Sequence, residues 1–223
     1  MDPLATKDQA DISVMKKIGV SFGEAIAAAR ASSRIPESFI AALVANESGG
    51  NPLAKRFEIL HFGEILAVLA GQRSTFNPPG ISRALGAADF AVFLNPDPVT
   101  TGINLPFSVA MSRAVALATS AGLTQIMGWH YLEFDLAYLL PAPSVDKQLR
   151  MTMNLLAYFA NRYTLSFTDD AAKLFACWNC GTPDPAKTYD PHYCARAVER
   201  MKIYETEHLQ TAAIPAPEPG AAG

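Results

Sequence analysis

This sequence has little excess charge of either sign, no long hydrophobic run and few cysteines. Its 223 residues include 18 lysines and arginines against 21 aspartates and glutamates, which gives a net charge of -3. A slightly acidic chain without a basic run lacks the attraction that sequence-independent nucleic-acid binding needs, so we expect no nucleic-acid partner. No segment is long and apolar enough to cross a bilayer, and we therefore expect no stable membrane insertion.

Cysteine occurs only at Cys177, Cys180 and Cys194. An odd number makes a poor disulfide framework, and the spacing of these cysteines from His192 fits no strong zinc motif, so we expect no metal. Cys177 is predicted to face the core as a small apolar residue. Cys180 and Cys194 flank a proline-rich loop, which they would clip by a disulfide in an oxidising compartment; reduced thiols are the default expectation.

The hydrophobic residues make up 50% of the chain and recur at helical spacing. This pattern predicts one all-α domain, α-dominated α+β at most, over residues 20–208. A partly disordered segment, 1–19, is expected before it and a disordered Pro/Ala/Gly tail, 209–223, after it. The predicted helices cover residues 20–33, 36–47, 57–70, 82–94, 107–119, 144–163, 168–178 with Thr168 as cap, and 190 onward. Residues 120–128 are expected to form a loop or short turn between helices.

Glu47 is the unusual residue of the predicted helix 36–47. It follows Leu43 by four positions and Val44 by three, which places it on the buried face of that helix. It also lies in the last turn, where the helix dipole is negative. Burial and the dipole both disfavour a charged carboxylate, so we expect a raised pKa, as a general acid for glycosidic bond cleavage needs.

Four short motifs resemble those of lytic transglycosylases and goose-type lysozymes, in the same order along the chain. Residues 45–52, Ala-Asn-Glu-Ser-Gly-Gly-Asn-Pro, resemble the Glu-Ser-x-Gly-Asn-Pro motif of these enzymes. Residues 122–128 resemble Gly-Leu-Met-Gln-Ile-Met, residues 176–181 resemble Ala-Tyr-Asn-x-Gly, and residues 193–198 resemble the closing Tyr-Val-x-Arg-Val helix. The resemblance implies a lysozyme-like fold with a substrate cleft and cleavage of peptidoglycan glycan strands.

The resemblance also assigns roles to residues. Glu47 would protonate the glycosidic oxygen between N-acetylmuramic acid and N-acetylglucosamine. The residues that would bind substrate beside it are Ser48, Thr124, Gln125, Ile126, Met127, Trp178, Asn179 and Tyr193. Ser48 would hydrogen-bond near the acid, and Asn179 would hold the cleft floor or a sugar N-acetyl group. Tyr193 would contact the substrate or Glu47.

Two of these residues depart from the family pattern. Thr124 stands where the family usually has Met, and it is expected to place a hydroxyl in the cleft. Trp178 stands where the family usually has Tyr, and its ring would offer a surface for stacking on a sugar face.

Glu58 is the candidate for a second catalytic carboxylate, which a hydrolase usually needs and a lytic transglycosylase does not. It lies at the predicted start of a helix beside Lys55 and Arg56, all of which favour its ionised form. The string Arg-Phe-Glu at 56–58 also resembles a segment of bacterial and phage N-acetylmuramidases. The alternative is an ordinary surface glutamate paired with Arg56, and the sequence leaves both possibilities open.

The resemblance implies an enzyme of the cell wall, a lytic transglycosylase or muramidase, whose partner is peptidoglycan and which uses no cofactor. The oligomeric state is open, with a monomer favoured. Residues 1–17 show no basic stretch followed by an apolar one, so no secretory signal is seen. This would fit phage-type release, or a bacterial enzyme whose signal has been removed. The rival expectation is a module of the same fold that binds glycan or a protein without cutting it.

Overall fold

The computed structural model describes residues 3–31, 33–78, 80–81, 83–94, 107–134 and 144–212. Helices dominate these residues, which confirms the α-dominated fold class. The helices are α1 (Pro3–Arg30), α2 (Glu37–Ser48), α3 (Ile59–Leu69), α4 (Ala87–Leu94), α5 (Phe107–Leu117), α6 (Tyr131–Phe134), α7 (Val145–Tyr163), α8 (Ala171–Cys180) and α9 (Tyr193–Ala212). The shorter elements are the strands β1 (Lys55–Phe57), β2 (Thr119–Ala121) and β3 (Ile126–Met127) and the 3-10 turns η1 (Gly128–His130) and η3 (Pro185–Lys187).

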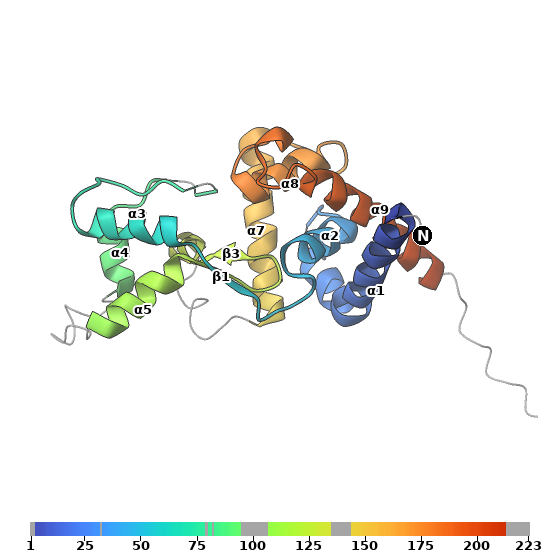
Figure 1. Cartoon of the computed structure of the whole chain (residues 1–223), viewed down its shortest axis with the longest axis horizontal. Helices are drawn as coiled ribbons and strands as arrows, with labels where there is room; N and C mark the ends of the chain where they lie inside the picture. The colour runs from blue at the N-terminus through green and yellow to red at the C-terminus, as the bar shows by residue number, and fades with distance from the viewer. Residues whose placement is uncertain are drawn as a thin grey trace, which may run out of the picture.

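The helices form two groups on either side of a small sheet. Helices α3, α4 and α5 lie at one end of the molecule, α1, α2, α8 and α9 lie at the other, and α7 stands between them (Figure 1). The sheet is antiparallel with the order β1-β2-β3, and it pairs Arg56 with Ser120 and Ser120 with Met127. Because β1 follows α2 directly, the sheet begins close to the end of the helix that carries Glu47.

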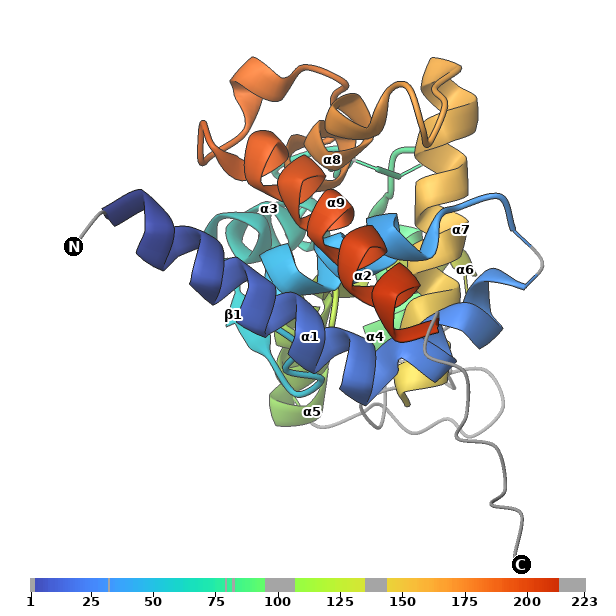
Figure 2. The same ribbon diagram turned by 90° about the vertical axis from the view of Figure 1, so that its right-hand side faces the viewer.

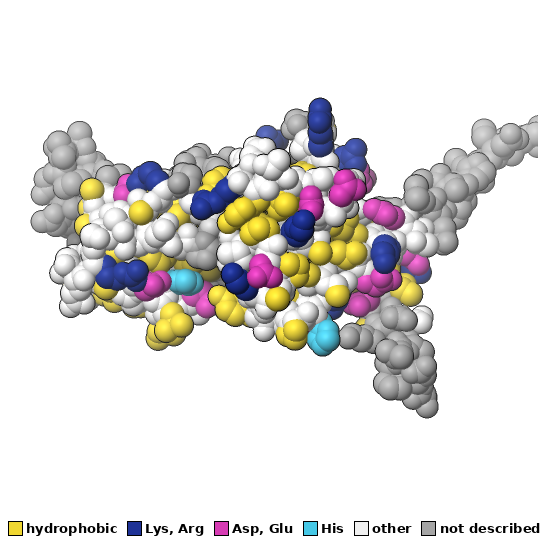
Figure 3. Space-filling model, turned by 90° about the horizontal axis from the view of Figure 1, so that it is seen from above, with side chains coloured by type: hydrophobic (Ala, Val, Ile, Leu, Met, Phe, Trp, Pro, Cys, Tyr) yellow, Lys and Arg dark blue, Asp and Glu magenta, His cyan; other side chains and the backbone are white. Residues whose placement is uncertain are grey.

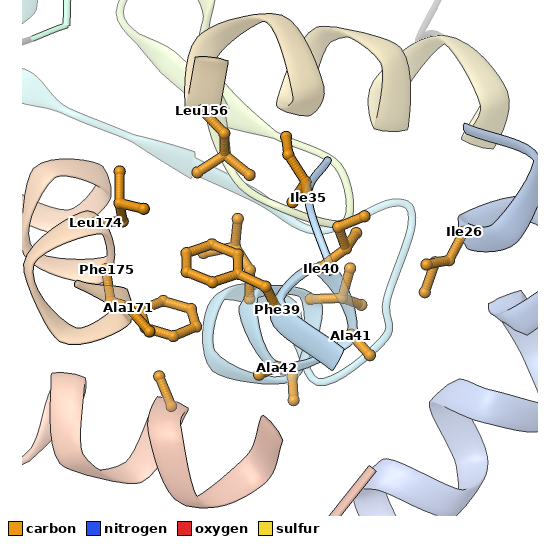
Figure 4. Packing of buried hydrophobic residues seen from close by; sticks show 14 of the residues in the cluster. Ile26, Ile35, Phe39, Ile40, Ala41, Ala42, Leu156, Ala171, Leu174 and Phe175 are labelled. Carbon is orange, nitrogen blue, oxygen red and sulfur yellow. The ribbon is translucent and has the colours of Figure 1, made fainter. Parts of the chain in front are cut away.

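The main hydrophobic core surrounds α2. Phe39 stacks on Phe175 of α8, with ring centroids 4.1 Å apart and planes 5° apart, and both side chains are fully buried. Ile40 lies next to Phe39, and Ile26 of α1, in the same cluster, lies farther from the two rings (Figure 4). Burying a side chain of this size stabilises the fold by about 1.5–3 kcal/mol. Helix α2 is therefore packed within the core up to Ala45, close to the residues at its end.

A second core lies among α3, α4 and α5. Phe76 contacts both Phe90 and Trp129, and Ile65 and Leu117 complete the cluster. Phe76 and Leu85 also pair through two backbone hydrogen bonds, which anchor the segment that follows α3. Each group of helices therefore has its own core.

The first helix begins much earlier than the sequence indicated. The predicted start at residue 20 is wrong, because α1 runs from Pro3, and the segment 1–19 is helical over all its described residues. Met15 and Ile18 are buried, and Phe22 packs against the same core. Their spacing is helical, but the polar residues Lys16, Lys17 and Ser21 between them mask the signal. At the other end, α9 continues to Ala212, and residues 213–223 of the predicted tail lie outside the described residues.

Two local predictions are also wrong. Residues 120–128 are not simply a loop, since Thr119–Ala121 and Ile126–Met127 form a hairpin in the sheet. Thr168 does not cap α8, because Asp170 occupies that position. Asp170 accepts a hydrogen bond from the backbone N–H of Ser166 and pairs with Lys173, so it closes the turn before the helix.

Within the part of the chain that the structure describes, no helix has both the length and the hydrophobicity to span a bilayer.

Candidate active site

Glu47 lies in the last turn of α2, on the side that continues the core. Leu43 and Val44, one turn before it, are fully buried. Gly49 ends the helix in the left-handed region, with φ +60°, which favours glycine because a Cβ is strained there. Glu47 itself is half-buried. Residues 38–45 of α2 are buried on every side of the helix, so Glu47 follows a fully buried segment rather than a single buried face.

The carboxyl group of Glu47 is held by Tyr193, the first residue of α9. The Tyr193 hydroxyl donates a hydrogen bond to Oε1 of Glu47. Burial raises the pKa of Glu47 from 4.5 to about 7, while the Tyr193 hydrogen bond and the charge of Arg56 lower it by less. Burial and the Glu47 carboxylate in turn raise the pKa of Tyr193 well above 10. Near neutral pH a substantial fraction of Glu47 therefore carries a proton.

The turn between β2 and β3 is hydrogen-bonded to the end of α2. The Ser48 hydroxyl donates to the backbone oxygen of Leu123 at 2.7 Å, and Gln148 of α7 accepts a hydrogen bond from the Leu123 N–H, also at 2.7 Å. Gly122 has φ +83°, and an added Cβ would lie 2.2 Å from Gln148 Oε1. The Ser48 hydroxyl therefore joins two segments of the protein beside the acid, and its role as a substrate contact stays a prediction.

The side-chain amide of Gln125 forms its hydrogen bonds within and next to its own hairpin. Its side-chain nitrogen donates to the backbone oxygens of Ala54 at 3.1 Å and Gly122 at 2.9 Å, and its side-chain oxygen accepts from the Ser120 hydroxyl at 3.0 Å. These bonds use both amide N–H groups. Both N–H groups are therefore engaged within the protein, where they stabilise a residue held at φ +54°, and the role of Gln125 as a glycan contact stays a prediction.

Thr124 faces the interior rather than a cleft. Its side chain is buried, and its hydroxyl bonds to the Thr152 hydroxyl at 2.7 Å. Its backbone oxygen accepts the indole N–H of Trp178 at 3.1 Å. The expectation that Thr124 places a hydroxyl in the cleft is therefore wrong. Trp178 remains half-buried, with its ring held by α8 beside the hairpin.

The other predicted binding residues are held by the fold. Ile126 is 2% exposed and packs with Tyr131, Met151 and Trp178, so it is a core residue and not a substrate contact. Met127 is half-buried against the second core. Asn179 accepts the backbone N–H of Tyr189 at 3.1 Å and so fixes the loop between α8 and α9. Its role as a sugar ligand stays a prediction.

Glu58 precedes α3 and pairs with Arg56. This is the ion pair that the alternative interpretation expected. Arg56 also acts on Glu47, since its charge lowers the pKa of that carboxyl group. One arginine thus lies within electrostatic reach of both carboxylates, and the catalytic role of Glu58 stays open.

Two further carboxylates are engaged elsewhere. Glu64 is bonded by His61 at 3.0 Å and by Arg73 at 2.6 Å, and these bonds lower its pKa. Asp89 accepts two hydrogen bonds from Arg83, which lower its pKa, and one from the backbone N–H of Gly86. On the described part of the face shown in Figure 3, acidic and basic side chains are interspersed and neither sign forms a continuous patch.

The cysteines are all free thiols. Cys177 is fully buried in the main core, as predicted, and burial raises its pKa to about 12. Among the described residues, no group of three or more histidine, cysteine, aspartate or glutamate side chains is placed to hold a metal ion.

A cavity of about 260 Å³ lies between the described residues of the stretch after α3 and the ends of α7 and α8. Its lining includes Pro78, Ile81, Arg162, Tyr163 and Cys180. None of the predicted site residues contributes to its wall, so this cavity is separate from the group around Glu47.

Three residues of the site were missed by the sequence analysis. Asn46, Arg200 and Asp11 form a hydrogen-bonded chain that ends on the backbone of Tyr193. A signal for Arg200 existed, because it follows Tyr193 by seven positions and thus lies two turns along the same helix face. No pattern pointed to Asp11, which is 189 positions away from its partner.

No protein-family model, curated protein or solved structure matches this chain.

Proposed function

We propose that this protein cleaves the β-1,4 bond between N-acetylmuramic acid and N-acetylglucosamine in peptidoglycan, with Glu47 as the general acid. The observation that carries the proposal is the Glu47 carboxyl group, half-buried at a helix end, with a pKa of about 7 and a hydroxyl donor on one oxygen. A general acid works best when its pKa is close to the working pH. The four family-like motifs supply the substrate class.

In this proposal Glu47 and Tyr193 have separate roles. Because the Tyr193 hydroxyl donates to Oε1, the acidic proton of Glu47 is carried on the other oxygen, from which it passes to the glycosidic oxygen as the bond breaks. The carboxylate left behind keeps the Tyr193 hydrogen bond, which favours the charged form and lowers the pKa of the group. Tyr193 thus stabilises the product of proton transfer.

The fate of the sugar depends on what attacks it. In a transglycosylase the 6-hydroxyl of muramic acid attacks and leaves a 1,6-anhydro end, so one carboxyl group suffices. In a hydrolase a second carboxylate directs water or forms a glycosyl intermediate, and Glu58 is the candidate. Such an enzyme would act at the cell wall.

The test is digestion of purified sacculi from Gram-negative and Gram-positive cells, with the soluble fragments analysed by mass spectrometry. Glu47→Gln is expected to lose about 10²- to 10⁴-fold in rate, because it keeps the shape but not the proton. Glu199→Gln on α9, which pairs with Lys202 and is 58% exposed, is the matched control and should keep full activity.

The products separate the remaining possibilities. Anhydro ends would show a transglycosylase, and Glu58→Gln should then be active. Reducing ends with an inactive Glu58→Gln would show a hydrolase. Folded wild-type protein that binds sacculi but releases nothing would refute the enzyme and leave a binding module.

A further inference from the structure

A charged pair lies behind the candidate site, between the first and last helices. Nε and Nη2 of Arg200 on α9 both donate to Oδ1 of Asp11 on α1, at 2.9 and 2.6 Å. The two side chains are only 12% and 16% exposed. Helices α1 and α9, which carry the pair, pack against each other and against α2 (Figure 2). A pair so little exposed has a fixed geometry, unlike a surface ion pair, which contributes little.

The guanidinium also fixes the amide of Asn46. Nη1 of Arg200 donates to Oδ1 of Asn46 at 2.7 Å. With its oxygen turned toward the cation, Asn46 must present its NH₂ group to the other side, since the reverse orientation would set donor against donor. That NH₂ group donates to the backbone oxygen of Tyr193 at 3.1 Å.

Tyr193 is consequently held at two points by neighbouring residues of α2. Asn46 bonds to its backbone and Glu47 to its hydroxyl. These three residues form a closed ring of contacts, and Arg200 with Asp11 supports the ring from outside. The other charged group that acts on Glu47 is Arg56, which comes from β1 and does not belong to this chain of contacts.

We propose that Asn46, Arg200 and Asp11 are positioning residues that hold Tyr193 against the Glu47 carboxyl group. The proposal rests on the proposed function of Glu47 as the acid. It gives α1 a part in the chemistry, although among the described residues the carboxyl group is contacted by Tyr193 and not by that helix. A charged pair joins the first and last helices, and through Asn46 it sets the angle at which the phenol meets the acid.

The test is the titration of Glu47 itself, followed by NMR in the full chain with ¹³C-labelled glutamate side chains. The Glu47→Gln variant identifies the signal. Asn46→Ala removes the link to Tyr193 without changing any charge, so the Tyr193 hydrogen bond weakens and the pKa of Glu47 rises by about 0.5 to 1. Lys16→Ala is the matched control, since it breaks the surface pair of Lys16 with Glu207 across the same two helices.

A double-mutant cycle separates positioning from general destabilisation. If Asn46 acts through Tyr193, then Asn46→Ala should change the pKa of Glu47 in the wild type but not in a Tyr193→Phe background. An equal shift in both backgrounds would overturn the proposal, and so would no shift in folded Asn46→Ala protein. If Asn46→Ala does not fold, the charge-neutral pair Asp11→Asn with Arg200→Gln takes its place, with the same expected rise and the same refutation.

Activity gives the second measurement. On sacculi, Asn46→Ala should lower kcat by about tenfold or more at nearly unchanged KM, because misalignment affects the reaction more than binding. If the wild type cleaves nothing, the proposed function fails. The titration would still show whether the network positions Tyr193.

Discussion

Replacing Glu47 by Gln is expected to make the protein more stable at neutral and alkaline pH. The folded protein holds the Glu47 carboxyl group at a pKa of about 7, against 4.5 for the free side chain. The unfolded chain therefore loses its proton first, and the free energy of unfolding of the wild type falls as the pH rises from about 4.5 to about 7. Glutamine keeps an oxygen for the Tyr193 hydroxyl and does not titrate, so the variant escapes this loss.

The size of the effect follows from the pKa. Each tenfold change in a protonation equilibrium corresponds to about 1.4 kcal/mol, so a rise from 4.5 to about 7 corresponds to about 3 kcal/mol at most. At pH 8 the variant should then exceed the wild type by up to about 3 kcal/mol, or roughly 6–12 °C in Tm for a chain of this size. Near pH 4 the pH-dependent part of the difference should vanish.

The assay is urea unfolding, followed by circular dichroism, of both proteins between pH 4 and pH 8. Glu64→Gln is the control of opposite sign, because His61 and Arg73 lower the pKa of Glu64. Its carboxylate stabilises the fold above the unfolded pKa, so that variant should lose stability at neutral pH relative to acidic pH. A constant difference between Glu47→Gln and the wild type over the whole range would refute the argument that burial holds the proton on Glu47.

Two further predictions concern other buried groups. Burial lowers the pKa of His130 to about 3, so as the pH falls below about 6.5 the unfolded chain binds a proton at this residue and the native protein does not. His130→Leu should therefore lose less stability than the wild type between pH 6.5 and pH 4.5, as measured by urea unfolding. Equal losses for the two proteins would contradict this. Gly128→Ala should lower the free energy of unfolding by about 1–3 kcal/mol or more, because the added Cβ would lie 2.0 Å from the backbone oxygen of Ala116. Gly63→Ala should raise it by up to about 1 kcal/mol, because Gly63 lies within α3 and an added Cβ there meets no atom within 4 Å. Comparable Tm values for the two variants would contradict this packing.

The place of Glu47 was predictable from the sequence because it depends on local periodicity. Leu43, Val44 and Glu47 share a face through the helical repeat alone, and the following glycines mark the helix end. The strands were not predictable in the same way. Thr119–Ala121 and Ile126–Met127 are too short to show an alternating pattern, and their pairing depends on β1, more than 60 positions earlier.

The partners of the Gln125 and Thr124 side chains were not predictable for a related reason. A motif gives a residue type and an approximate place, but not the partner that a side chain finds. Gln125 sits at φ +54° in a tight hairpin, where its amide is the nearest group to satisfy the surrounding backbone oxygens. Thr124 lies against a threonine of α7, and this pairing appears only when the hairpin and α7 are folded together.

The network of Asn46, Arg200 and Asp11 beside Tyr193 was also not predictable from the sequence. Its cation, Arg200, is linked to Glu47 only through Asn46 and Tyr193, and the charge that acts on the Glu47 carboxyl group is that of Arg56. Asp11 pairs with Arg200, and the guanidinium orients Asn46, while burial holds the pKa of Glu47 near 7. The arginine, its counter-charge and the amide come from the last helix, the first helix and α2. Because each is unremarkable in its own segment, the arrangement exists only in the folded chain.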